Sequence, residues 1–125
     1  MKEKIHTSFA PDAIGTYSQA IKVGSTVYFS GQIPLDPATM SIVTGDIAAQ
    51  ATRVFTNLKE VAVAAGGSLD QMAKLTIFLT DLTHFPMVNE VMSTFFNEPY
   101  PARSTVQVSA LPRGAEIEIE GIMVV

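Results

Sequence analysis

Two segments near the C-terminal end of the chain alternate between polar and apolar residues, and they constrain the fold more than any other feature. The first covers residues 103–110 and begins with Arg103, and the second covers residues 116–125. Alternation with a period of two predicts β-strands, because successive side chains of a strand point to opposite faces. Three glutamates share one face of the second segment: Glu116, Glu118 and Glu120. We expect a turn at residues 111–114 to join the strands as an antiparallel hairpin, which would place Arg103 on the face of the glutamates.

A face shared by a cation and clustered carboxylates has two interpretations, and the pattern leaves both open. Same-face carboxylates lie roughly 7 Å apart along a strand and repel one another, so an exposed strand with its charges in water is one explanation. The other is an anion site, in which the planar fork of Arg103 holds a carboxylate through two hydrogen bonds. A neighbouring glutamate would then act as a base toward water or a nitrogen.

The composition is that of a folded domain with part of its surface covered by a partner. A chain of 125 residues is one domain of ordinary size, and we expect residues 1–125 to form it. Apolar residues make up 47% of the chain and charged residues 16%, which argues against disorder. The low charged fraction also predicts that the domain assembles into an oligomer.

Several classes of function are disfavoured by the residues that the chain lacks. Without cysteine there is no disulfide or thiolate chemistry, and the two histidines, His6 and His84, lack the spacing of zinc ligands. The net charge of −4, with no basic run, argues against a nucleic-acid partner. The chain has no apolar run long enough for a membrane span, and the N-terminal residues do not resemble a signal peptide. We therefore expect a cytoplasmic protein without a membrane contact.

The first half of the chain reads as strands followed by a helix. Alternating residues 17–23 and 26–30, separated by a Gly-Ser pair, predict a hairpin. A short extended segment is expected at residues 41–44. Asp46 is a suitable N-cap for a helix, and apolar residues recur at helical spacing over residues 47–65 before two glycines end the pattern.

The second half continues with a strand at residues 75–79 and a second helix that ends at residues 97–99, with Asp81 or Thr83 as its cap. Two helices can cover only one face of a sheet, whereas several strands are apolar on both faces. We therefore expect the uncovered face to contact another subunit. We expect that face to carry part of the set Val27, Phe29, Ile77 and Leu79 together with their neighbours.

Five fragments, spread over nearly the whole chain, carry a resemblance to a known family. They are Gly15–Ala20, Ser30–Pro34, Asn89, Pro101–Ser104 and Ile117–Glu120. Each fragment is weak alone, but in this order and spacing they resemble the reactive intermediate deaminase family, the RidA type, also called perchloric-acid-soluble proteins. The resemblance implies a chorismate-mutase-like α/β (α+β) fold with two helices on one face of a sheet. It also implies a homotrimer with a central β-barrel and a cleft at each subunit boundary.

An activity follows from the same resemblance, namely the hydrolysis of reactive enamines and imines to 2-oxo acids and ammonia. The implied substrates are of the 2-iminobutanoate and 2-iminopropanoate type, including 2-aminoacrylate released by pyridoxal-phosphate enzymes. The protein itself would need no cofactor. A 2-imino acid carries its carboxylate next to the reacting carbon, so a residue that binds the carboxylate also fixes the carbon.

Roles carry over from the family position by position. Arg103 would bind the substrate carboxylate, Glu118 would hold and activate the attacking water, and Tyr17 would form a wall of the cleft. Further substrate contacts would come from the side chains of Ser30 and Asn89 and from the backbone of Gly31 and Thr105. The family often has cysteine at the position of Thr105, so a role that needs a thiol is lost here while a backbone N–H role survives.

Three other functions remain open. A non-catalytic trimer that senses 2-oxo acids would use the same Arg103 contacts, so only turnover separates it from an enzyme. Ribonuclease activity or translation inhibition, attributed to some family members, is disfavoured by the acidic charge of the chain. Chorismate mutase activity rests on the fold alone, and a fold does not establish a function.

Overall fold

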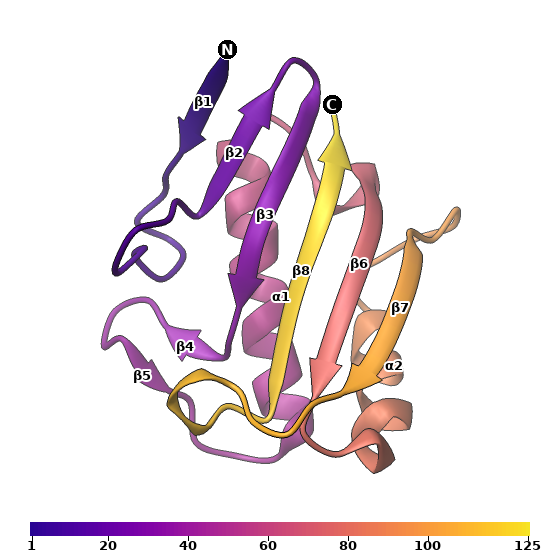
Figure 1. The fold of residues 1–125 in the computed structure, drawn as a ribbon. Coiled ribbons are helices and arrows are strands. Elements are labelled where there is room, and N and C mark those ends of the chain that lie inside the picture. The colour runs from indigo at the N-terminus through magenta and orange to yellow at the C-terminus, as the bar shows by residue number, and fades with distance from the viewer.

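A six-stranded mixed β-sheet forms the centre of the protein (Figure 1). The computed structural model describes residues 1–125. Across the sheet the strands run in the order β1 (Lys2–Ile5), β2 (Ala20–Val23), β3 (Thr26–Gln32), β8 (Ile117–Val124), β6 (Met72–Leu79) and β7 (Ala102–Gln107). Neighbours are antiparallel except β6 and β7, which are parallel. A separate small hairpin pairs β4 (Leu35–Asp36) with β5 (Ser41–Ile42).

Two helices, α1 (Ile47–Ala64) and α2 (Phe85–Met92), lie behind the sheet in Figure 1. The carboxylate of Asp46 accepts a hydrogen bond from the N–H of Ala49 at 3.0 Å, so the predicted N-cap of α1 is confirmed. Three short 3₁₀ turns complete the chain: η1 (Leu69–Gln71), η2 (Leu82–His84) and η3 (Pro112–Gly114). The helices and the sheet share one hydrophobic core, so the chain forms a single α+β domain. No helix has both the length and the apolar character that crossing a membrane requires.

The sheet has one face under the helices and one face without helical cover (Figure 1), as predicted, but of the residues expected on the open face only the neighbours of the four named ones lie there. Val27, Phe29, Ile77 and Leu79 all lie in the core beneath the helices. The alternation showed apolar side chains on both faces without indicating which face the helices cover. The open face instead carries the residues between them, and its exposed apolar side chains include Tyr28, Val106 and Val124.

The predicted C-terminal hairpin is also wrong. β8 lies between β3 and β6, and β7 lies at the edge of the sheet, parallel to β6. The reason is the path of the chain: it leaves β6 through α2, and a strand that returns after a helical crossover runs parallel to the first strand. Ile117, Ile119 and Met123 of β8 are fully buried, which favours a central position with a neighbour on each side.

Candidate functional site

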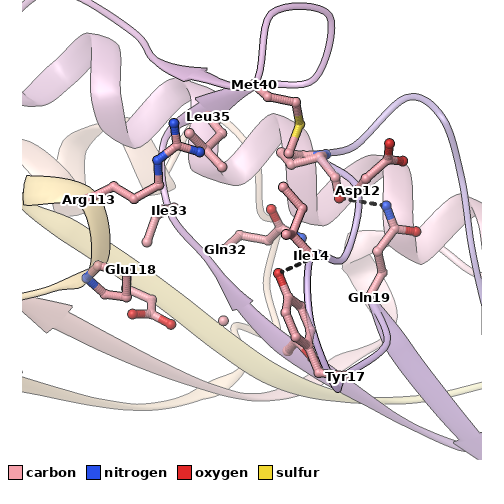
Figure 2. Close-up of a pocket in the computed structure, with 14 residues that line it drawn as sticks. Asp12, Ile14, Tyr17, Gln19, Gln32, Ile33, Leu35, Met40, Arg113 and Glu118 are labelled. Carbon is pink, nitrogen blue, oxygen red and sulfur yellow. Dashed lines mark hydrogen bonds between the residues drawn. The ribbon is translucent and has the colours of Figure 1, made fainter.

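Glu118 stands on the open face of the sheet and lines a cavity of about 550 Å³ (Figure 2). In the pairing of β8 with β6, Glu118 lies opposite Phe78. The residues before and after Phe78 face the core, so Phe78 and Glu118 both point to the open face. Burial raises the pKa of the half-buried Glu118 carboxyl above its ordinary value, and the negative charge of nearby Glu120 raises it further. A raised pKa makes Glu118 a stronger proton acceptor than an exposed glutamate.

Gly31 makes room for the Glu118 carboxylate. A Cβ atom at this position would overlap Oε2 of Glu118 and would lie 2.8 Å from its Cδ. The pairing of β3 with β8 is irregular between Phe29 and Gln32, so the backbone of Gly31 sits where the regular ladder is interrupted. Only glycine allows the backbone and the carboxylate to approach this closely, which brings together two residues that the resemblance singled out.

Tyr17 and Ser30, two of the residues for which the resemblance implies a role, line the same cavity. The hydroxyl of Tyr17 accepts a hydrogen bond from the N–H of Ile14 at 3.3 Å, and its exposed ring stands at the cavity wall (Figure 2). The hydroxyl of Ser30 donates to the carbonyl of Ser18 at 2.5 Å, so in this chain it braces the loop before β2. Both side chains therefore form part of the wall of this cavity.

Gln19 holds this wall in place, a role that its position in a motif did not reveal. The side chain is almost fully buried, and its amide Nε2 donates to the carbonyls of Thr7 at 3.0 Å and Pro11 at 2.8 Å. Its Oε1 accepts from the N–H of Thr7 at 2.7 Å. One buried amide thus fixes the N-terminal loop over the cavity, because buried polar groups require such partners.

Arg103 lies elsewhere, on the helix side of the edge strand β7. Its Nη1 donates to Oδ1 of Asn89 at 2.7 Å, and its guanidinium carbon stands 4.8 Å from the centroid of the Phe85 ring. Arg103 pairs with core-facing Leu75 of β6, whereas Glu118 pairs with Phe78 on the other face of that strand. Within one chain the two predicted catalytic residues are therefore on opposite faces of the sheet with β6 between them.

Thr105 belongs to the Arg103 side of β7. Its Oγ1 is buried and has no hydrogen-bond partner. The N–H of Val108 donates to the carbonyl of Leu79 on β6 at 2.8 Å, and N–H groups alternate in direction along a strand. Thr105 lies three residues before Val108, an odd number, so its N–H points in the opposite direction. It is therefore directed away from β6, out of the free edge of the sheet. It is a donor that the sheet itself does not use.

One cation, Arg113, and one aromatic ring, Phe85, were left without a role in the site by sequence reasoning. Arg113 lines the Glu118 cavity, where a left-handed backbone (φ 58°) within η3 directs its side chain over the cavity (Figure 2). Phe85 forms the platform beneath Arg103. No local signal marks either residue, because both contacts arise between segments distant in sequence. No group of three or more His, Cys, Asp or Glu residues is placed to hold a metal ion.

The chain is similar to known proteins over nearly its whole length. The family model described as Endoribonuclease L-PSP matches residues 7–125. The 2-iminobutanoate/2-iminopropanoate deaminase of Dermatophagoides farinae is 48% identical over 99% of this chain and 97% of its own length. The crystal structure of RidA from an Antarctic Psychrobacter species is 52% identical, covers 98% of this chain and 99% of its own, and superposes with a TM-score of 0.95.

A further solved structure contains a ligand. The crystal structure of E. coli TdcF with bound serine is 43% identical, covers 98% of both chains and has a TM-score of 0.93. With matches of this extent, the resemblance inferred from the sequence motifs is confirmed, and the chain belongs to the RidA family, also described as the L-PSP and RutC family.

Proposed function

We propose that this protein is an imine deaminase that hydrolyses 2-iminobutanoate, 2-iminopropanoate and related enamines to 2-oxo acids and ammonia. The observation that carries the proposal is the half-buried Glu118 with its raised pKa, set against Gly31 in a cavity of about 550 Å³. Relatives that bear this activity in their names support it, including the Dermatophagoides farinae protein at 48% identity. Such a base is what the addition of water to an imine requires.

The complete active site in this proposal forms between subunits of a homotrimer. Arg103 of one chain, at a free sheet edge, meets the Glu118 cavity of the next chain, and the open sheet faces together line a central β-barrel. Exposed apolar side chains on the open face, among them Tyr28 and Val124, support an assembly that covers them. The separation of Arg103 from Glu118 within one chain supports a shared site.

In the proposed mechanism, Arg103 binds the substrate carboxylate through two parallel hydrogen bonds and so places the adjacent imine carbon. Glu118 accepts a proton from a water molecule while the water oxygen forms a bond to that carbon of the protonated imine, and the electron pair of the carbon–nitrogen π bond moves to the nitrogen. The product of this step is a tetrahedral carbinolamine. Glu118 then returns the proton to the nitrogen. The carbon–nitrogen bond breaks while the hydroxyl oxygen gives its proton back to Glu118 and forms the carbonyl, so ammonia and the 2-oxo acid leave.

The remaining site residues would hold the substrate without taking part in proton transfer. The outward N–H of Thr105 would donate to the substrate carboxylate, and the backbone of Gly31 would contact the reacting end. Tyr17 and Ser30 would shape the wall, and Asn89 would act through its bond to Arg103. The bound serine in the TdcF structure, an amino acid with a carboxylate beside its amino carbon, supports a carboxylate-binding site.

One coupled assay tests the proposal. The protein is added to a threonine dehydratase reaction, and the rate of 2-oxobutanoate release is followed with and without the protein. We expect acceleration in proportion to protein concentration, and none with Glu118→Gln. A protein that binds 2-oxobutanoate but gives no acceleration at high concentration would instead be a sensor of 2-oxo acids. Hydrolysis of RNA, which the family description names, gains no support from the net charge of −4.

A further inference from the structure

Arg103 lies at the exposed edge of the sheet, yet α2 holds its guanidinium from two directions. Nη1 donates to Oδ1 of Asn89 at 2.7 Å and to Sδ of Met92 at 3.5 Å. The guanidinium carbon stands 4.8 Å from the centroid of the Phe85 ring. A free arginine side chain samples many rotamers and loses that freedom on binding a ligand. These three contacts select one orientation before a ligand arrives.

The same three contacts leave some N–H donors of the guanidinium bonded and others free. Asn89 and Met92 both engage Nη1, whereas Nε and Nη2 donate no hydrogen bond. A ring beneath the guanidinium attracts it through its negative face and uses none of its N–H groups. The Nε–Nη2 edge therefore remains free, and two parallel donors are what a carboxylate binds.

We propose that Phe85 is a positioning residue, whose ring orients the Arg103 guanidinium so that the Nε–Nη2 edge receives the substrate carboxylate. Phe85, Asn89 and Met92 follow one another at intervals of four and three residues, which places them on one face of α2. This face is a cradle for Arg103. The inference rests on the proposed function in one respect, that Arg103 binds a carboxylate.

The first test measures binding without turnover. Isothermal titration with 2-oxobutanoate, a stable 2-oxo acid, is carried out on the assembled protein and on Phe85→Leu, Phe85→Tyr and a variant with 3,4,5-trifluorophenylalanine at position 85. The fluorinated ring keeps its shape but loses the negative face. We expect the leucine and fluorinated variants to bind about three- to tenfold more weakly and Phe85→Tyr to bind as the unchanged protein does. Binding of the fluorinated variant at full strength would overturn the proposal.

A matched control separates orientation from packing. Phe95 is also half-buried but packs on Phe55, with a centroid distance of 5.4 Å, and not on Arg103. We expect Phe95→Leu to change the thermal unfolding temperature but not the affinity for 2-oxobutanoate. If Phe95→Leu weakens binding as much as Phe85→Leu does, the effect is one of general packing and the proposal fails.

Kinetics give a second readout. A carboxylate contact exists in the ground state and in the transition state, so Phe85→Leu should raise KM by about the same three- to tenfold while kcat falls less. In an Arg103→Lys background, Phe85→Leu should add little, because the planar group it orients is gone. Additive losses in the double variant would contradict the proposal. If the unchanged protein binds 2-oxobutanoate but shows no turnover, only the proposed deaminase activity is refuted. If the unchanged protein does not bind 2-oxobutanoate, the positioning role of Phe85 is refuted as well.

Discussion

At the scale of single residues, Glu118 combines two properties that oppose each other. Its carboxylate is half-buried beside the charge of Glu120, and both effects raise its pKa and disfavour the ionised form. The same environment makes the carboxylate a better base. Gly31 removes the side chain that would otherwise occupy the space of the carboxylate. The position is therefore costly for stability and useful for proton transfer.

Glu118→Gln should abolish turnover while retaining the affinity for 2-oxobutanoate. The amide keeps the shape of the side chain but cannot accept the proton of water, and we expect a loss of about a hundredfold or more. Glu118 has a higher pKa in the folded state, so its ionised form opposes folding at neutral pH. The variant should therefore unfold at a higher temperature at neutral pH, and the difference should vanish below the ordinary glutamate pKa of about 4.3. Full activity in a folded Glu118→Gln protein would remove Glu118 from the mechanism.

Glu120→Gln should remain active and shift the acid side of the pH–rate profile. The charge of Glu120 helps to raise the pKa of Glu118, so its removal lowers that pKa. Since the base must be ionised to accept a proton, activity should persist to lower pH than in the unchanged protein. The profile of kcat/KM against pH measures the shift. An inactive Glu120→Gln protein would mean that the base had been assigned to the wrong glutamate.

Arg103→Lys should lose most activity while folding normally. An ammonium group cannot reproduce the two parallel donors of a guanidinium. The loss of one charge-assisted hydrogen bond costs about 1.5 to 3 kcal/mol, or roughly tenfold to more than a hundredfold in kcat/KM. Arg53 provides the control, because it also donates to an asparagine, Asn57 at 3.0 Å, but lies on α1. The Arg53→Lys protein should keep its activity. Near-native turnover by the Arg103→Lys protein would show that Arg103 does not bind the substrate carboxylate through two parallel hydrogen bonds.

At the scale of elements, β7 is an edge strand whose outward donors have no partner in the sheet. It pairs with β6 on one side only, because the crossover through α2 brings it back parallel at the end of the sheet. Donors of this kind are available to a ligand or to another chain. The backbone N–H of Thr105 is one of them, whereas its Oγ1 is buried on the helix side.

Thr105→Ala and Thr105→Cys should both retain activity within about tenfold, a change of less than roughly 1.4 kcal/mol in the barrier. In the proposed site the backbone N–H is the donor, and neither substitution removes it. Steady-state kinetics on the assembled variants measure the effect. A folded and assembled Thr105→Ala protein with activity reduced a thousandfold would show that the hydroxyl takes part, and the backbone account would have to be abandoned.

The same elements show what the sequence could and could not predict. The N-cap at Asp46 and the strand at 75–79 were predictable because capping and periodicity are local signals. Periodicity reports which side chains share a face but not which strands are neighbours, so β7 and β8 were wrongly paired. Arg103 and Glu118 were identified through the family resemblance, yet their placement on opposite faces depends on β6 lying between them. The cradle of Arg103 depends on the docking of α2, which no local pattern contains.

At the scale of the whole molecule, the proposed function divides the active site into two half-sites on each chain. One surrounds Arg103 at the edge strand, and the other surrounds Glu118 on the open face. In the proposed homotrimer each half-site is completed by a neighbouring chain, and the apolar side chains of the open face are covered.

Light scattering should accordingly give about three times the chain mass of 13.4 kDa. Subunit mixing provides a stricter test, because Arg103→Lys and Glu118→Gln chains each keep one intact half-site. When the two variants are unfolded and refolded together, about a quarter of the sites in a random mixture should contain both intact halves. Activity should rise toward that fraction, whereas each variant refolded alone stays inactive. A mixture that remains inactive, or a stable monomer, would contradict the shared site.

The placement of Arg103 and Glu118 on opposite faces of one sheet also bears on symmetry. In the proposed shared site, each chain has a surface that offers a cation and a different surface that receives one, so contact between copies would run head to tail. A pair of chains joined through one such head-to-tail contact would leave an unused cation at one end and an empty cavity at the other. A closed ring leaves neither, and it contains as many complete sites as chains. For a protein of this design, ring closure is what makes every copy equivalent.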